Sequence, residues 1–183
     1  LGERAVRPDG MAPPPMLDYV PANAAGDPAA GATHKQAAFQ PNPIYRAPVG
    51  EEGQRVVFLI PFTPPPGQDD LAFFIGATPG LQEIKLNGTV LQPNIPLDTL
   101  RGATDGTAHY YPIPPALLRA GENRITVLIE TQSSIHALAP FHIGPAIEAA
   151  RAAGAVDIIT RITPIIAISV LVFATLLCLV TNW

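Results

Sequence analysis

The chain has 183 residues, with 22 Pro, 15 Gly, a single Cys and only 14% charged residues. Proline makes up about 12% of the chain, against a usual share near 5%, which excludes a helical bundle and a long coiled coil because proline breaks helices. The net charge is −4 and no two Lys or Arg residues are adjacent, so we expect no nucleic-acid partner. The length suits one domain with additional segments.

The first fifty residues are rich in proline and alanine, with 9 Pro and 11 Ala. Such a segment has too little apolar surface to offset the entropy lost on ordering. We therefore predict an extended Pro/Ala-rich strap over residues 1–36, which is either a flexible tail or a docking strip for a partner. Its main apolar cluster comprises Met11, Met16, Leu17, Tyr19 and Val20.

Short apolar runs separated by turn residues extend over residues 37–140, a pattern typical of an all-β domain. The clearest runs predict strands over residues 55–62, 71–76, 82–91 and 123–131. Asn87-Gly88 is the dipeptide that most favours a two-residue type I′ hairpin turn. The fold class is therefore mainly β, and the size of the region matches a sandwich or jelly roll.

The stretch from His109 to Glu130 reads HYYPIPPALLRAGENRITVLIE and combines an extended entry, a short helical turn, a tight turn and a core strand. Together with the LNGTVL hairpin at residues 86–91, it resembles the galactose-binding-like jelly roll. The resemblance implies a jelly-roll β-sandwich over residues 37–140. Members of that family bind carbohydrate or serve as structural modules, so the fold alone names no ligand.

A chargeless run of 22 residues extends from Ile162 to Trp183. As a helix it would be about 33 Å long, enough for the hydrocarbon core of a bilayer. We predict one transmembrane helix over residues 162–183, the alternative being a buried helix of a soluble protein. Ala167 and Ala174 are seven residues apart and would let a neighbouring membrane helix pack closely.

A juxtamembrane helix is predicted over residues 141–161, where the chain is rich in alanine and other helix formers. Ile147, Ala150, Gly154 and Ile158 share one face at helical spacing. Gly154 would be a hinge, because glycine within a helix costs about 1 kcal/mol relative to alanine. The same stripe of small residues would admit another helix, and a plain spacer is the remaining alternative.

The order of these segments gives a second resemblance. A jelly roll, the Gly144-Pro145 junction, a short helix carrying Arg151 and Thr163-Pro164 at the membrane entry are similar to the sensor portion of bacterial seven-transmembrane receptors with diverse intracellular signalling modules. The resemblance ends after the first of the seven helices. The chain is then either the N-terminal piece of such a receptor or a reuse of the module as a single-pass protein of the bacterial inner membrane, and the resemblance implies that the β-domain lies on the periplasmic side.

Catalytic and metal-binding patterns are weak. His34, His109, His136 and His142 show no metal-ligand spacing, and no phosphate-binding loop, nucleophile elbow or Cys-His pairing occurs. We therefore expect a protein that is not an enzyme and that carries neither a metal nor a cofactor.

The best candidate for a ligand site is a cluster of aromatic and charged residues before the last core strand. His109, Tyr110 and Tyr111 supply rings that could stack on a sugar, and Asp98 and Arg101 could fix its hydroxyl groups. Tyr110 and Tyr111 alternate across a strand, so one of them is expected to point into the core.

Two functions remain open. The chain is either a sensor module that binds carbohydrate or another small ligand and passes the signal through its membrane helix, or a single-pass accessory subunit. In the second case, the membrane helix packs against other membrane protein subunits and the sandwich covers their exposed face.

Overall fold

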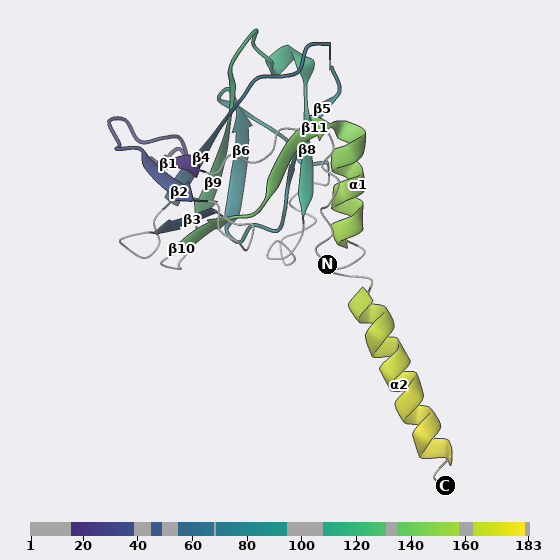
Figure 1. Ribbon diagram of the computed structural model, residues 1–183. Coiled ribbons are helices and arrows are strands. Elements are labelled where there is room, and N and C mark those ends of the chain that lie inside the picture. The colour runs from purple at the N-terminus through teal and green to yellow at the C-terminus, as the bar shows by residue number, and fades with distance from the viewer. Residues whose placement is uncertain are drawn as a thin grey trace.

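The computed structural model describes residues 16–38, 45–48, 55–67, 69–94, 108–130, 135–157 and 163–181. The chain is mainly β, as predicted, with antiparallel sheets, and two helices follow the last strand (Figure 1). The strands are β1 Met16–Pro21, β2 Lys35–Ala38, β3 Tyr45–Pro48, β4 Arg55–Phe62, β5 Leu71–Ile75, β6 Leu81–Leu86, β7 Thr89–Val90, β8 His109–Ile113, β9 Asn123–Glu130, β10 Ile135–Leu138 and β11 Phe141–Pro145.

A six-stranded sheet forms one layer, in the order β2-β1-β4-β9-β6-β7. Its central strands β4 and β9 consist largely of β-branched and aromatic residues, which favour a pleated, buried surface. Their side chains alternate between the two faces, so that Phe58 and Val127 point into the core while Val57 and Leu128 lie on the outer face. The sheet therefore has an apolar patch on each side.

A three-stranded sheet, ordered β11-β5-β8, forms the opposite layer, and β10 pairs with β3 in a third, two-stranded sheet. A single hydrophobic cluster fills the space between the two larger sheets, so they pack face to face as a β-sandwich consistent with a jelly roll. Its members include Leu17, Phe58, Ile84 and Ile125 from the six-stranded sheet and Leu71, Phe73, Tyr111 and Phe141 from the three-stranded sheet.

The predicted hairpin at Asn87-Gly88 is confirmed. Asn87 has φ 51° and Gly88 has φ 90°, and the two residues join β6 to β7. Positive φ at both central residues is the requirement of a type I′ turn, which glycine meets without strain and asparagine tolerates better than most residues.

The N-terminal segment differs from the predicted strap. β1 pairs with both β2 and β4 as part of the six-stranded sheet, so residues 16–21 and 35–38 belong to the sandwich. Leu17 and Tyr19 lie in the core, where the Tyr19 ring packs 5.8 Å from that of Phe58. Cross-strand pairing thus orders a segment whose composition alone predicts no core. Residues 1–15, including Met11, lie outside the described residues.

The predicted juxtamembrane helix begins later than expected, because residues 141–145 form β11 of the three-stranded sheet. Helix α1 (Ala146–Asp157) follows directly and packs on the outer face of that sheet, against β5, β8 and β11 (Figure 1). Ala149 is fully buried in this contact, whereas Ile147 of the predicted stripe is 57% exposed. The face that packs is therefore the one carrying Ala149, whose small side chain allows a close approach.

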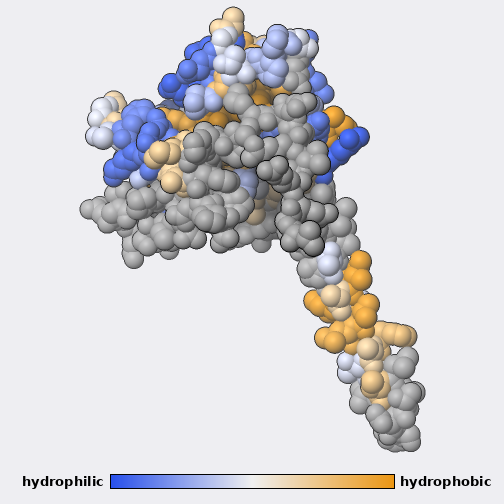
Figure 2. Space-filling model, in the orientation of Figure 1, coloured by the Kyte–Doolittle hydropathy of each residue, from blue (hydrophilic) through white to orange (hydrophobic). Residues whose placement is uncertain are grey.

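Helix α2 (Thr163–Thr181) has 19 residues, and in Figure 1 it extends away from the sheets. Orange apolar side chains predominate on the coloured part of its surface in Figure 2. Over the part of the chain that the structure describes, no helix combines the length and apolarity needed to cross a membrane. The transmembrane helix over residues 162–183 therefore stays a prediction.

Candidate functional site

The predicted ligand cluster is only partly brought together at the surface. His109 and Tyr111 are buried, and Tyr110 between them is half-buried. Tyr111 is only 2% exposed, and burial raises the pKa of its hydroxyl to about 12. Its ring is a core element rather than a surface for stacking, in line with the predicted alternation. Asp98 and Arg101 lie outside the described residues.

A groove lies elsewhere, on the outer face of the six-stranded sheet. It consists of two cavities of about 420 and 280 Å³ that share Glu122 and Arg124. The larger cavity is lined by Asp27, Pro28, Asn87, Gly88, Arg119, Glu122, Arg124 and Thr126. The smaller one is lined by Met16, Leu17, Asp18, His34, Leu59, Pro61, Glu122 and Arg124. We call the two together the groove.

One wall of the groove is the loop between β1 and β2, residues 22–34, which we call the flap. The flap covers the outer apolar patch of the sheet, where Ala22 and Ala32 pack against Val20, Val57, Leu59 and Leu128. At Gly26 the backbone has φ 78°, and a Cβ there would lie 2.7 Å from Leu128 Cδ2. Glycine is thus required at this point both by the turn and by the close approach to the sheet.

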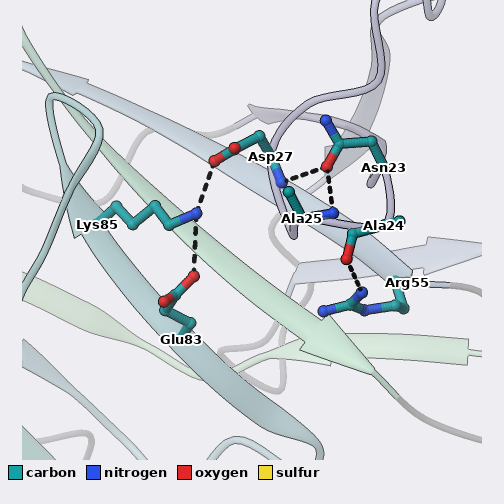
Figure 3. A network of polar contacts seen from close by, with 7 residues as sticks. All are labelled: Asn23, Ala24, Ala25, Asp27, Arg55, Glu83 and Lys85. Atoms are coloured by element: carbon teal, nitrogen blue, oxygen red, sulfur yellow. Dashed lines mark hydrogen bonds and ion pairs between the residues drawn. The ribbon is translucent and has the colours of Figure 1, made fainter.

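An ion pair between Lys85 and Asp27 holds the flap to the sheet (Figure 3). Lys85 of β6 is only 9% exposed, and its Nζ lies 2.6 Å from Asp27 Oδ1 of the flap and 3.0 Å from Glu83 Oε2 of the same strand. The hydrogen bond to Asp27 is the main cause that raises the pKa of Lys85, and Glu83 acts in the same direction, whereas burial opposes them. The lysine therefore stays charged at neutral pH and ties the flap to β6.

The flap is also fixed near its tip. Asn23 Oδ1 accepts hydrogen bonds from the backbone N–H groups of Ala25 and Asp27, both at 2.9 Å. Arg55 Nη1 donates to the carbonyl oxygen of Ala24 at 3.0 Å (Figure 3). Asparagine readily closes such turns on its own backbone. The flap wall of the groove is thus a defined loop.

The opposite wall is the turn before β9, which is organised by a buried asparagine. Asn123 is 1% exposed, and its Nδ2 donates to the carbonyl oxygens of Arg119 and Gly121 at 3.1 and 3.0 Å. Its Oδ1 accepts from the Arg119 N–H and from Asn87 Nδ2, both at 2.8 Å. All hydrogen-bonding positions of the amide are therefore used, and the turn is locked against the β6–β7 hairpin.

Between these walls, several polar side chains line the groove and could form further hydrogen bonds. Arg124 Nη2 lies 3.6 Å from Glu122 Oε1, and both side chains are mostly exposed, so the pair is weak. Arg119 and Thr126 line the larger cavity beside them. Among the described residues, no group of three or more His, Cys, Asp or Glu side chains could hold a metal ion. The arrangement is suited to binding.

No pattern in the sequence predicts this groove. Asn87, Gly88 and the turn at residues 119–123 were recognised as elements of the fold, but their shared position with Asp27 depends on the flap folding back across three strands. No local pattern announces such a contact, since Asp27 and Lys85 are 58 residues apart.

No known family model matches the sequence, and no curated protein matches it significantly. The fold and the residues that line the groove are therefore the basis for proposing a function.

Proposed function

We propose that the chain is a membrane-anchored, non-enzymatic β-sandwich that binds a ligand on the periplasmic side of a bacterial inner membrane. In this proposal it forms the N-terminal part of a signalling receptor, as its resemblance to bacterial receptor sensors implies. The observation that carries the proposal is the packing of α1 on the three-stranded sheet directly after β11.

Strand β11 leads into α1 without an intervening loop. The N–H of Ala146 donates to the carbonyl oxygen of Asp70 at 3.1 Å, and Ala149 is buried against the sheet. Packed elements move together when either is displaced, because close-packed interiors are stiff. A ligand that shifts the sandwich would therefore displace α1.

The membrane anchor is supported by the exposure of apolar side chains along α2. Seven large apolar residues between Ile165 and Phe173 are each 53–68% exposed. So large an apolar surface is unfavourable in water and marks a lipid or protein contact. The chargeless run also continues past α2 to Ile162 and Trp183, outside the described residues, which makes the whole run about 33 Å long as a helix.

A second candidate function is a single-pass accessory subunit of a membrane complex. It is favoured by Ala167 and Ala174, which lie seven residues apart in α2 and are both exposed. Small residues at this spacing allow a neighbouring helix to approach closely. In this case α2 would contact other subunits as well as lipid.

Carbonate extraction of native membranes tests the anchor. The full chain should remain in the pellet, and a double variant Val170→Arg/Phe173→Arg should move to the soluble fraction, because charge at the centre of a bilayer is costly. Ile147→Arg, which adds charge to an exposed position of α1, is the matched control and should stay with the membranes. Release of the wild-type chain, or retention of the double variant, would contradict the anchor.

The reading frame beyond Trp183 then separates the two functions. Further apolar spans followed by a cytoplasmic signalling domain would support the receptor and exclude the accessory subunit. A stop codon, together with co-purification in a stable membrane complex, would exclude the receptor.

A further inference from the structure

The groove joins two cavities of different chemistry on the outer face of the six-stranded sheet. The larger cavity, of about 420 Å³, is lined mainly by polar and charged residues, and its volume lies within the range of about 300–1,000 Å³ typical of small-ligand sites. The smaller cavity, of about 280 Å³, includes Met16, Leu59 and Pro61, whose side chains are apolar. Glu122 and Arg124 line both cavities, so one ligand can extend from the polar end of the groove to its apolar end.

The charges at the polar end leave one arginine without a counter-charge. Asp27 Oδ1 lies 2.6 Å from Nζ of the buried Lys85. Glu122 Oε1 lies 3.6 Å from Arg124 Nη2. Arg119 is exposed at the same cavity and makes no ion pair with any residue that the structure describes. The polar end is therefore suited to an anionic group.

A carboxylate suits this position better than a phosphate. The N–H groups of a guanidinium match the two oxygens of a carboxylate and bind both of them at once. A phosphate monoester carries nearly two negative charges at neutral pH. The cavity offers one arginine without a counter-charge and places the carboxylates of Asp27 and Glu122 nearby, so a single negative charge is what it can balance.

The strand register places the polar and apolar ends side by side. On the outer face of the sheet, Pro61 of β4 lies opposite Arg124 of β9, and Leu59 lies opposite Thr126. Neighbouring strands are about 4.8 Å apart, so the two ends are separated by about the reach of one amino-acid side chain. Met16 of β1, which is 49% exposed, extends the apolar end.

The charges at the apolar end set the orientation of an anionic ligand. Asp18 lines the smaller cavity, 3.7 Å from His34. Among the described residues that line this cavity, the only Lys or Arg is the shared Arg124. Because like charges repel, a ligand carboxylate is disfavoured beside Asp18 and favoured beside Arg119.

We propose that the groove binds an apolar amino acid through its carboxylate, either as the free amino acid or as the C-terminal residue of a peptide. The carboxylate lies beside Arg119, and the apolar side chain lies over Leu59 and Pro61. The inference rests on the proposed function in one respect, since it names the ligand class of the binding module. It places the ligand on the six-stranded sheet, away from the buried rings of β8.

Isothermal titration calorimetry of the full chain, purified in a mild detergent, tests the inference. The probes are free leucine, N-acetyl-leucine as a mimic of a peptide C-terminus, N-acetyl-leucinamide, which lacks the charge, and N-acetylglycine, which lacks the side chain. Leucine or N-acetyl-leucine should bind with a Kd near the millimolar range because the groove is open, and the tighter of the two identifies the source of the carboxylate. The amide and N-acetylglycine should each bind about tenfold more weakly.

Two substitutions separate the ends of the groove. Arg119→Gln should weaken binding of the tighter leucine ligand by about tenfold and leave the amide unchanged, because it removes a charge-assisted hydrogen bond. Met16→Ser should weaken the same ligand but not N-acetylglycine, because it removes apolar contact area. Arg151→Gln, at an exposed arginine on α1, is the matched control and should bind as the wild type does. Thermal unfolding of each variant verifies that it is folded.

Three results would overturn the inference: no heat with leucine or N-acetyl-leucine up to about 50 mM, well above the expected Kd; equal affinity for the tighter leucine ligand and for the amide; or unchanged binding of that ligand in Arg119→Gln. These measurements in detergent do not depend on membrane insertion or on signalling. Failure here would therefore leave the carbonate-extraction result intact, and failure there would not affect binding in the groove.

Discussion

Replacing Asn123 with alanine removes the residue that organises the turn beside the groove. The side chain is almost fully buried and makes four hydrogen bonds, two to Arg119 and one each to Gly121 and Asn87. In the Asn123→Ala variant all four partners lose this contact. Water can replace the lost contact at the backbone groups of Arg119 and Gly121, because both residues are exposed. It can reach the side-chain amide of the half-buried Asn87 only partly.

The magnitude follows from these contacts. Each lost hydrogen bond costs about 1 kcal/mol where water can replace the partner, and more where it cannot. The Asn123→Ala change should therefore lower the free energy of unfolding by about 3–5 kcal/mol, a large part of the stability of a small domain. Asn123→Asp keeps an acceptor oxygen but sets its second carboxylate oxygen against the carbonyl oxygens of Arg119 and Gly121 at a buried position, so it should lose at least as much.

Equilibrium urea unfolding of the full chain in one detergent, followed by near-ultraviolet circular dichroism, measures these values. Gln82→Ala, an exposed change on β6, is the control and should lie within about 0.5 kcal/mol of the wild type. If Asn123→Ala unfolds within the same margin, or if Asn123→Asp lies within it, the hydrogen-bond account of this turn is incorrect.

Three further predictions follow from the flap and the core. Burial raises the pKa of Tyr111 from 10.0 to about 12, so between these pH values the folded state keeps a proton that the unfolded chain loses. The free energy of unfolding is therefore unaffected by this group below pH 10 and falls by about 3 kcal/mol as the pH rises to 12. Urea unfolding at pH 9 and 11.5 should show a smaller decline for Tyr111→Phe, and an equal decline would contradict the assignment. Lys85→Met should speed amide hydrogen exchange of the flap by about tenfold, whereas the exposed control Lys35→Met should leave it unchanged. Gly26→Ala should destabilise the protein by more than Gly31→Ala does. Both glycines have positive φ, where alanine costs about 1–2 kcal/mol, but only at Gly26 would the added Cβ also meet a side chain, that of Leu128. Equal losses of stability in thermal unfolding would show that the flap does not contact the sheet so closely.

The sequence predicted those parts of the fold that are encoded locally. The β4 and β9 strands are rich in β-branched residues, and the type I′ turn follows from Asn87-Gly88 alone. β1 was not predicted because MLDYV is short and lies among prolines and alanines. Its alternation of buried and exposed side chains identifies a strand only when the pairing with β4 is known. β11 was predicted to be part of a helix because it is also short and its pairing with β5 cannot be read from the sequence.

The candidate site was less predictable than the fold. Tyr110 and Tyr111 are adjacent aromatic residues and attracted attention, yet Tyr111 fills the core. The groove instead depends on Lys85 meeting Asp27, a contact between distant segments that only the folded sheet creates. Local sequence patterns report burial and turns, but they do not report which loops share a surface.

Hydrogen exchange of the full chain in detergent, with and without a compound that raises its thermal unfolding midpoint, tests the central claim most directly. A ligand in the groove that is coupled to α1 should slow exchange in the flap and in residues 119–126, and should also change exchange in α1. Protection confined to β8 would place the ligand elsewhere. Protection of the flap with no change in α1 would contradict the coupling between the sandwich and the helix that leads to α2.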